Sequence, residues 1–252
     1  MQRRTLLRSS ALAPLMVLPR RVGAETYPRT IDWSGQIWAV KDSGTRVTGP
    51  GGNRFSSSTD HVRVTEDGAL QLRITPAGGQ WACAEVVAGE PGDFGYGTYH
   101  WVMETPADAV RRWAILGLFT WDAQSAEQAN REIDVEIGRW RGDASGHNGF
   151  FTVQPYTLPG ASLGYPIPSG TGPVSVGFTW SAGRVEFKAA MGPQLTPTDL
   201  DDVIASWTTS SGVPTPGLEQ PRINLWLQHH RTPKPERPIT VRMRSFAFTS
   251  TE

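Results

Sequence analysis

Several features are scarce in this chain, and each absence argues against a class of protein. Cys83 is the only cysteine, so no intramolecular disulfide can form. Charged residues make up 19% of the 252 residues and the formal net charge is +0, which argues against nucleic acid as the main partner. No spaced set of His and Cys is present, and the GPGG stretch at 49–52 lacks the Lys-Ser/Thr of a phosphate-binding loop.

Long apolar runs are also missing, and the longest near the N-terminus, residues 11–19, is too short to span a bilayer as a helix. Arg3 and Arg4 precede it, and small residues follow it up to Ala24. This order predicts a signal peptide of the twin-arginine type over residues 1–24 and a secreted or periplasmic protein. A basic N-terminus on a cytosolic protein is the alternative. Residues 25–252 are then expected to form one domain without a membrane span.

Turn-forming residues and short alternating segments are abundant. The chain has 27 Gly and 20 Pro, and segments such as HVRVTEDGALQLRI, REIDVEI and RVEFKAAM alternate apolar and polar residues. EDG at 66–68 and SAG at 181–183 predict hairpin turns. Thr198 is a candidate N-cap for a short helix or turn in TPTDLDDVIASW. Many strands at short spacing predict an all-β sandwich, a jelly roll of two antiparallel sheets.

The segment REIDVEIGRW, residues 131–140, places three acids at alternate positions, Glu132, Asp134 and Glu136. On a strand these carboxyl groups share one face, with about 6.6 Å between successive acids. Taken alone, the pattern favours an ordinary solvent-exposed strand. Retaining glycosidases, however, need two carboxyl groups about 5–5.5 Å apart, which two inward-leaning Glu side chains can supply. A Ca²⁺ or Mg²⁺ site is disfavoured, because it needs more oxygen ligands from a loop.

At this point the chain resembles glycoside hydrolase family 16, the jelly-roll endo-glycanases that include lichenases and laminarinases. EIDVE fits the E-[ILV]-D-x-E signature of that family in its unbulged form. GYGTYHWVM, GLFTWD, FTWSAGRVEFKA and INLWLQ resemble further family segments and occur in the family's order. The resemblance spans most of residues 53–248, and it implies a concanavalin A-like fold with a concave substrate cleft.

The resemblance implies catalytic roles for the three acids: Glu132 as nucleophile, Asp134 as assisting carboxylate and Glu136 as general acid/base. It also implies that Trp226, Asn224 and Glu85 line the cleft, and it allows Asn53 as a contact at the rim. Two departures bear on the substrate. Lichenase-like members follow the Glu that corresponds to Glu85 with Tyr and a substrate-binding Arg, whereas this chain has Val86 and Val87. They also often carry Trp-Asp before the nucleophile, where this chain has Asn130 and Arg131.

Further residues are candidate substrate contacts. Trp121 and Trp140 flank the acidic segment, and aromatic rings beside acids suit a carbohydrate ligand. Gln154 and Tyr156 share one face of a predicted strand, with core or hairpin packing as the alternative. His229, which is followed by His230, is a candidate at the edge of the cleft, with an exposed loop as the alternative.

The sequence therefore predicts a monomeric retaining hydrolase of β-linked polysaccharide that needs no cofactor, although the resemblance allows a structural calcium ion. A transglycosylase on the same glycans and a non-catalytic carbohydrate-binding protein remain alternatives.

Overall fold

Two antiparallel sheets make up the protein. A computed structural model describes residues 26–110, 113–140, 144–228 and 235–251. The first sheet has, in spatial order, strands β1 (Thr26–Trp33), β2 (Gln36–Asp42), β6 (Ala84–Ala88), β15 (Gln220–Leu227), β8 (Ala114–Trp121), β9 (Ile133–Gly138), β10 (Gly149–Val153) and β11 (Ser162–Tyr165). The second has β14 (Val203–Thr209), β13 (Arg184–Met191), β12 (Val174–Ser181), β7 (Gly97–Met103), β16 (Ile239–Ser250), β4 (Leu70–Ala77) and β3 (Val62–Val64), with β5 (Gln80–Ala82) paired to β4.

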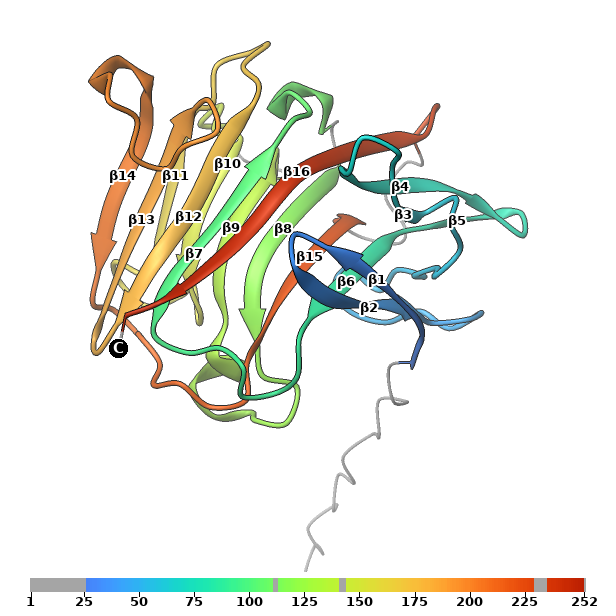
Figure 1. Cartoon of the computed structure of the whole chain (residues 1–252), viewed down its shortest axis with the longest axis horizontal. Helices are drawn as coiled ribbons and strands as arrows, with labels where there is room; N and C mark the ends of the chain where they lie inside the picture. The colour runs from blue at the N-terminus through green and yellow to red at the C-terminus, as the bar shows by residue number, and fades with distance from the viewer. Residues whose placement is uncertain (1–25, 111–112, 141–143, 229–234, 252) are drawn as a thin grey trace, which may run out of the picture.

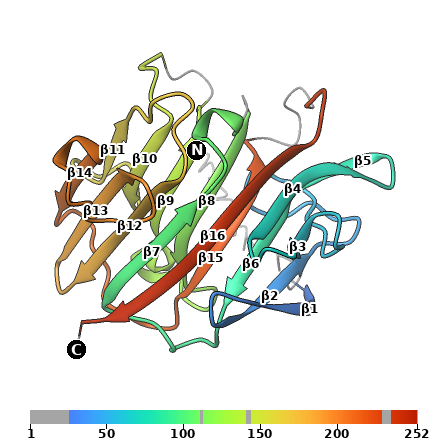
Figure 2. The ribbon, with the colours of Figure 1, turned by 45° about the horizontal axis from the view of Figure 1, so that its top comes forward.

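The two sheets lie face to face, with β7 and β16 of the second sheet over the middle of the first (Figures 1 and 2). Sequence neighbours such as β8 and β9 pair directly, whereas β15 enters between β6 and β8 from far along the chain. This crossed order is that of a jelly roll, so the prediction of an all-β sandwich is confirmed. The only helical segments in the described ranges are three short 3-10 turns, η1 (Ala107–Ala109), η2 (Glu127–Arg131) and η3 (Leu200–Asp202).

Both predicted hairpin turns are present. Val64 pairs with Leu70 around the turn at 66–68, and Ser181 pairs with Arg184 around the turn at 181–183. Gly183 has a φ of 68°, which a glycine adopts without the steric cost of a Cβ. The predicted cap of the short helix was wrong by one residue: Asp199, not Thr198, accepts the hydrogen bond from the Asp201 amide. The rest of that segment continues as β14.

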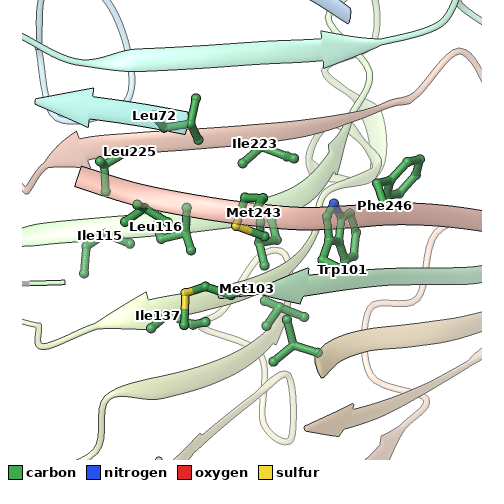
Figure 3. Packing of buried hydrophobic residues seen from close by; sticks show 14 of the residues in the cluster. Leu72, Trp101, Met103, Ile115, Leu116, Ile137, Ile223, Leu225, Met243 and Phe246 are labelled. Carbon is green, nitrogen blue, oxygen red and sulfur yellow. The ribbon is translucent and has the colours of Figure 1, made fainter. Parts of the chain in front are cut away.

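Large aromatic and aliphatic side chains fill the space between the sheets. In Figure 3, Trp101, Met243 and Phe246 of the second sheet face Leu116, Ile223 and Leu225 of the first. Side chains of this size contribute about 1.5–3 kcal/mol each when fully buried. Because strands alternate their faces, this inner packing forces the intervening residues of β15, β8 and β9 to point away from the second sheet. That outer face of the first sheet carries the candidate site.

Within the described ranges, no helix is both long enough and apolar enough to cross a bilayer.

Candidate active site

Strand β9 presents its two faces to different surroundings. Three of its aliphatic side chains have 0% exposure and belong to the core: Ile133, Val135 and Ile137. The alternating Asp134 and Glu136 therefore point to the outer face, and Glu132 stands immediately before the strand, after η2. A hydrogen bond joins the side chains of Glu132 and Asp134. The sequence pattern thus brings the first two carboxyl groups into contact and places the third on the same face.

Asp134 is buried and the two glutamates are half-buried, and loss of hydration raises the pKa of all three carboxyl groups. For Glu132 and Glu136, loss of hydration is the largest cause, and the negative charge of Asp134 adds to it. Burial raises the pKa of Asp134 to about 7, while hydrogen bonds from Gln154 and Glu132 act in the opposite direction. Three neighbouring carboxyl groups cannot all be ionised at neutral pH, so they share protons and titrate as a unit. It can thus hold a protonated and an ionised carboxyl group at the same time.

The two glutamates have different neighbours. The positive charge of Arg222 favours the ionised form of Glu132, but burial and Asp134 outweigh it and raise the pKa of Glu132 to about 10. Glu136 accepts a hydrogen bond from the side chain of Trp140, which also acts to lower its pKa. A nearby cation and a hydrogen bond to a carboxylate both favour ionisation, so each glutamate has one neighbour that opposes the effect of burial.

Two of the other predicted residues contact the carboxyl groups directly. Gln154 Nε2 donates to Asp134 Oδ2 at 3.0 Å. The side chain of Trp140 donates a hydrogen bond to Glu136. Its ring also packs edge-on against the ring of Trp226, with ring centroids 5.7 Å apart and an interplanar angle of 65°. Side chains from β9, from β15 and from the segments that follow β9 and β10 therefore lie close together.

A row of residues across four strands extends the site. Glu85 pairs with Asn224, Asn224 with Gly117, and Gly117 with Glu136. Gly117 has no side chain, and a Cβ there would lie 2.5 Å from Asn224 Oδ1, so the glycine makes room for the amide. Asn224 is 2% exposed, and its Oδ1 has no hydrogen-bond partner among the described residues. A buried acceptor with no partner costs free energy unless a ligand or water donates to it.

Glu85 lies in a buried ion cluster. Its carboxylate accepts from Arg222 Nη1 at 3.0 Å and from Lys41 Nζ at 3.2 Å, and all three side chains are at most 5% exposed. Lys41 also donates to the carbonyl of Gly49 and lies 4.4 Å from the ring centroid of Phe55. Arg222 belongs both to this cluster and to the surroundings of Glu132, whose pKa its positive charge lowers.

Sequence reasoning missed Lys41 and Arg222. Arg222 had a detectable signal, because it alternates with Asn224 and Trp226 on β15 and therefore shares their face. Lys41 had none, since a lysine near the end of a strand usually reaches solvent.

The remaining predicted contacts have varied surroundings, and their roles stay predictions. Asn53 is 3% exposed and donates to the carbonyls of Pro50 and Leu227, so its amide binds the backbone. Trp121 is half-buried at the end of β8. Tyr156 is 68% exposed, and its amide donates to Gln154 Oε1 at 3.0 Å. His229 lies outside the described residues.

Sequence reasoning also overlooked a Gly-x-Ser-x-Gly pattern at 160–164. In serine hydrolases this pattern forms a sharp turn between a strand and a helix. Here Ser162 begins β11, and its hydroxyl pairs with that of Thr152 on the neighbouring strand. The local structure therefore does not favour a nucleophilic serine.

Cys83 is buried with 1% exposure, as expected for a small apolar side chain. Across the parts of the chain that the structure describes, no group of three or more His, Cys, Asp or Glu side chains is arranged to hold a metal ion. The structural calcium ion stays a prediction.

The structure is a jelly roll with three neighbouring acidic residues on one face of its first sheet. No family model matches the sequence, and no curated protein matches it either. Solved structures do match. The chain is similar to the Bacillus licheniformis β-glucanase, with a TM-score of 0.59 and 16% identity over 91% of this chain and 100% of that one.

Two other similar structures differ in the function that is described for them. A glycoside hydrolase family 16 endo-glucanase from Bacteroides ovatus has a TM-score of 0.58 and 13% identity, over 84% of this chain and 94% of that one. An immunostimulatory antigen and pseudo β-1,3-glucanase of Mycobacterium tuberculosis has a TM-score of 0.57 and 14% identity, over 85% and 91%. These likenesses confirm the expected fold, that of family 16 glucanases.

Proposed function

We propose that the protein hydrolyses a β-linked polysaccharide, a β-glucan or a related glycan, with retention of anomeric configuration. The observation that carries the proposal is the coupled set of Glu132, Asp134 and Glu136 beside the paired rings of Trp140 and Trp226. Aromatic rings stack on the apolar faces of sugars, and two carboxyl groups in opposite protonation states supply acid and nucleophile.

In the first step, Glu136 protonates the glycosidic oxygen while ionised Glu132 attacks the anomeric carbon, which forms a glycosyl-enzyme ester and releases the leaving sugar. In the second, Glu136 removes a proton from water, which attacks the same carbon and frees Glu132. Asp134 accepts a hydrogen bond from Glu132 and takes up its proton as Glu132 attacks, while burial keeps a proton on Glu136. The unpartnered Oδ1 of Asn224 is placed to accept a hydrogen bond from a sugar hydroxyl.

The proposal is tested with purified protein on β-glucans, agar, carrageenan and xyloglucan. We expect endo-type cleavage, in which viscosity falls faster than reducing ends appear. Glu132→Ala should lower kcat by at least about 1000-fold, since the ester cannot form. Azide should then restore turnover of a dinitrophenyl glycoside and give the α-glycosyl azide. Glu186→Gln, an exposed ion-paired glutamate on β13, serves as the matched control. Unchanged turnover in Glu132→Ala, or a first product of inverted configuration, would contradict the mechanism.

The glycan itself is a separate question. The chain lacks the Tyr-Arg pair that follows the sugar-binding Glu in lichenase-like members, because Val86 and Val87 take those places. A transglycosylase would use the same three acids and pass the sugar to another glycan. Product analysis with and without added oligosaccharide separates the two, because only the transglycosylase lengthens the acceptor.

One observation favours a second candidate, a non-catalytic glycan-binding protein. The carboxyl group of Glu136, the proposed acid, already accepts a hydrogen bond from Trp140. A protein of similar fold is also described as a pseudo β-1,3-glucanase. If no glycan in the panel is cleaved but one of them binds, this second function replaces the first.

We also propose that residues 1–24 direct export and that the mature chain acts as a monomer in the periplasm or outside the cell. Fractionation of cells, N-terminal sequencing of the mature protein and light scattering test these points.

A further inference from the structure

The backbone that leads into Glu132 is left-handed over four consecutive residues. The φ angles are 48° at Gln128, 48° at Ala129, 58° at Asn130 and 54° at Arg131. None of these is glycine, and a left-handed conformation places the Cβ of any other residue too close to a carbonyl oxygen. Such a turn persists only where its surroundings hold it, and backbone strain of this kind concentrates at functional sites.

Arg131 is the side chain that closes this turn. Its Nη1 pairs with Asp122 Oδ2 at 2.8 Å, and its Nε donates to the carbonyl of Thr215 at 3.0 Å. The guanidinium packs against Gly217, where an added Cβ would lie 2.5 Å from Arg131 Nε. The pair is largely buried, with 15% exposure for Arg131 and 3% for Asp122. A largely buried ion pair whose guanidinium is also held by a second hydrogen bond restrains geometry far better than an exposed ion pair.

Asp122 connects the turn to two other segments. Its Oδ1 accepts from the amides of Gln124 and Ser125 at 2.9 and 3.1 Å, and its Oδ2 accepts from the amide of Leu218 at 3.2 Å. The Asp122 amide donates to the carbonyl of Asn130 at 2.7 Å. The end of β8, the left-handed turn and the segment before β15 are therefore joined at one carboxylate.

The restraint passes directly to Glu132. Thr120 Oγ1 donates to the carbonyl of Arg131 at 2.9 Å and accepts from the amide of Ile133 at 3.2 Å, so it spans the residues on either side. The amide of Glu132 donates to Ala129, and its carbonyl accepts from Gln154 at 3.1 Å. The position of the Glu132 side chain is thus set by the turn that Arg131 closes.

We propose that Arg131 is a positioning residue for Glu132: its pairing with Asp122 locks the left-handed turn and fixes the Glu132 carboxyl group beside Asp134. This assignment rests on the proposed function, in which Glu132 is the nucleophile. It also explains a role for Arg131 at a position where lichenase-like members often have Asp.

The test compares Arg131→Gln and Arg131→Lys with the wild type, and Arg184→Gln is the control. Arg184 forms an exposed ion pair with Glu186 at 2.8 Å, so its loss should change nothing. We expect Arg131→Gln to lower kcat about 100-fold with KM within about twofold, because a nucleophile displaced by 1 Å misses the reacting geometry. Arg131→Lys keeps the charge but loses the second contact, and it should recover about a tenth of wild-type kcat.

A second readout does not depend on turnover. Carboxyl titration is followed by infrared spectroscopy, and the Glu132 band is assigned by its loss in Glu132→Gln. Burial and Asp134 raise the pKa of Glu132. Without the Arg131–Asp122 pair, the left-handed turn should loosen and the Glu132 side chain should reach water. We therefore expect the Glu132 carboxyl group of Arg131→Gln to titrate at lower pH than in the wild type.

The outcomes separate the two proposals. If folded Arg131→Gln keeps both kcat and the Glu132 titration, or if Arg131→Lys folds and shows wild-type values for both, the positioning role is wrong. A fall in kcat that only matches a smaller folded fraction also contradicts it. If the wild type cleaves no glycan, the hydrolase proposal fails, and the titration alone decides whether Arg131 positions Glu132.

Discussion

Replacement of Asp134 by Asn should make the protein more stable at neutral pH and less active. Asp134 is 4% exposed, and burial raises its pKa from 3.8 to about 7. A raised carboxyl pKa means that the folded state binds the proton more tightly than the unfolded state does. The resulting stability is fully present below pH 4 and is lost as the pH rises through 7.

The magnitude follows from the size of this shift. About three pH units at 1.36 kcal/mol each correspond to roughly 4 kcal/mol lost by pH 8. Asn has nearly the same shape, carries no charge, and its carbonyl can accept the hydrogen bond from Gln154. We therefore expect Asp134→Asn to gain roughly 2–4 kcal/mol at pH 8, which raises Tm by roughly 5–10 °C, and to gain little at pH 4.

Urea unfolding at several values between pH 4 and pH 8 measures the effect. Asp201→Asn, a change at an exposed position in η3, is the control and should follow the wild type. Activity gives a second check, because the charge of Asp134 raises the pKa of Glu132 and Glu136. The variant should show a lower kcat and a pH optimum shifted to the acid side. Parallel wild-type and Asp134→Asn stability curves would refute the argument that burial of this charge costs stability.

Three further substitutions test other parts of the structure. Gly117→Ala should push the Asn224 amide aside and raise KM about 3–10-fold, the value of one hydrogen bond, and should add nothing to Asn224→Ala. Ala129→Gly should raise the free energy of unfolding in urea by about 0.5–1 kcal/mol, because glycine adopts the left-handed φ without strain. Ala126→Gly, at a φ of −89°, should lower the free energy of unfolding instead. Glu85→Gln should cost about 3–5 kcal/mol in thermal unfolding, because it removes the anion that pairs with two buried cations, and a cost below about 1 kcal/mol would contradict that.

The sheet architecture could be predicted because alternation is a local signal. Ile133, Val135 and Ile137 alternate with acids, and burial of the apolar set determines which face the acids occupy. The same argument places Asn224 and Trp226 on the outer face of β15. The order of strands was not predictable in this way. β15 lies between β6 and β8 because of long-range pairing, which no local pattern encodes.

The missed features of the site depend on contacts between distant segments. Asn130 and Arg131 were visible as departures from the family pattern, but their left-handed backbone is imposed by hydrogen bonds to Asp122 and Thr215. Four non-glycine residues in succession give no turn signature, because they adopt this conformation only under tertiary restraint. The sequence therefore identifies positions 130 and 131 as unusual, but it does not predict their left-handed backbone.

Cross-strand pairing changes the meaning of the other departure, at Val87. Val87 is paired with Arg222 across the β6–β15 ladder, and Arg222 also bonds Glu85. A guanidinium is therefore present on this face one strand away from the position that carries an Arg in lichenase-like members. Its charge acts both on Glu85 and on Glu132, which lies on the other side of β8. Glu85 thus stabilises Arg222, and Arg222 favours the ionised form of Glu132, so electrostatic interactions link Glu85 to the proposed nucleophile.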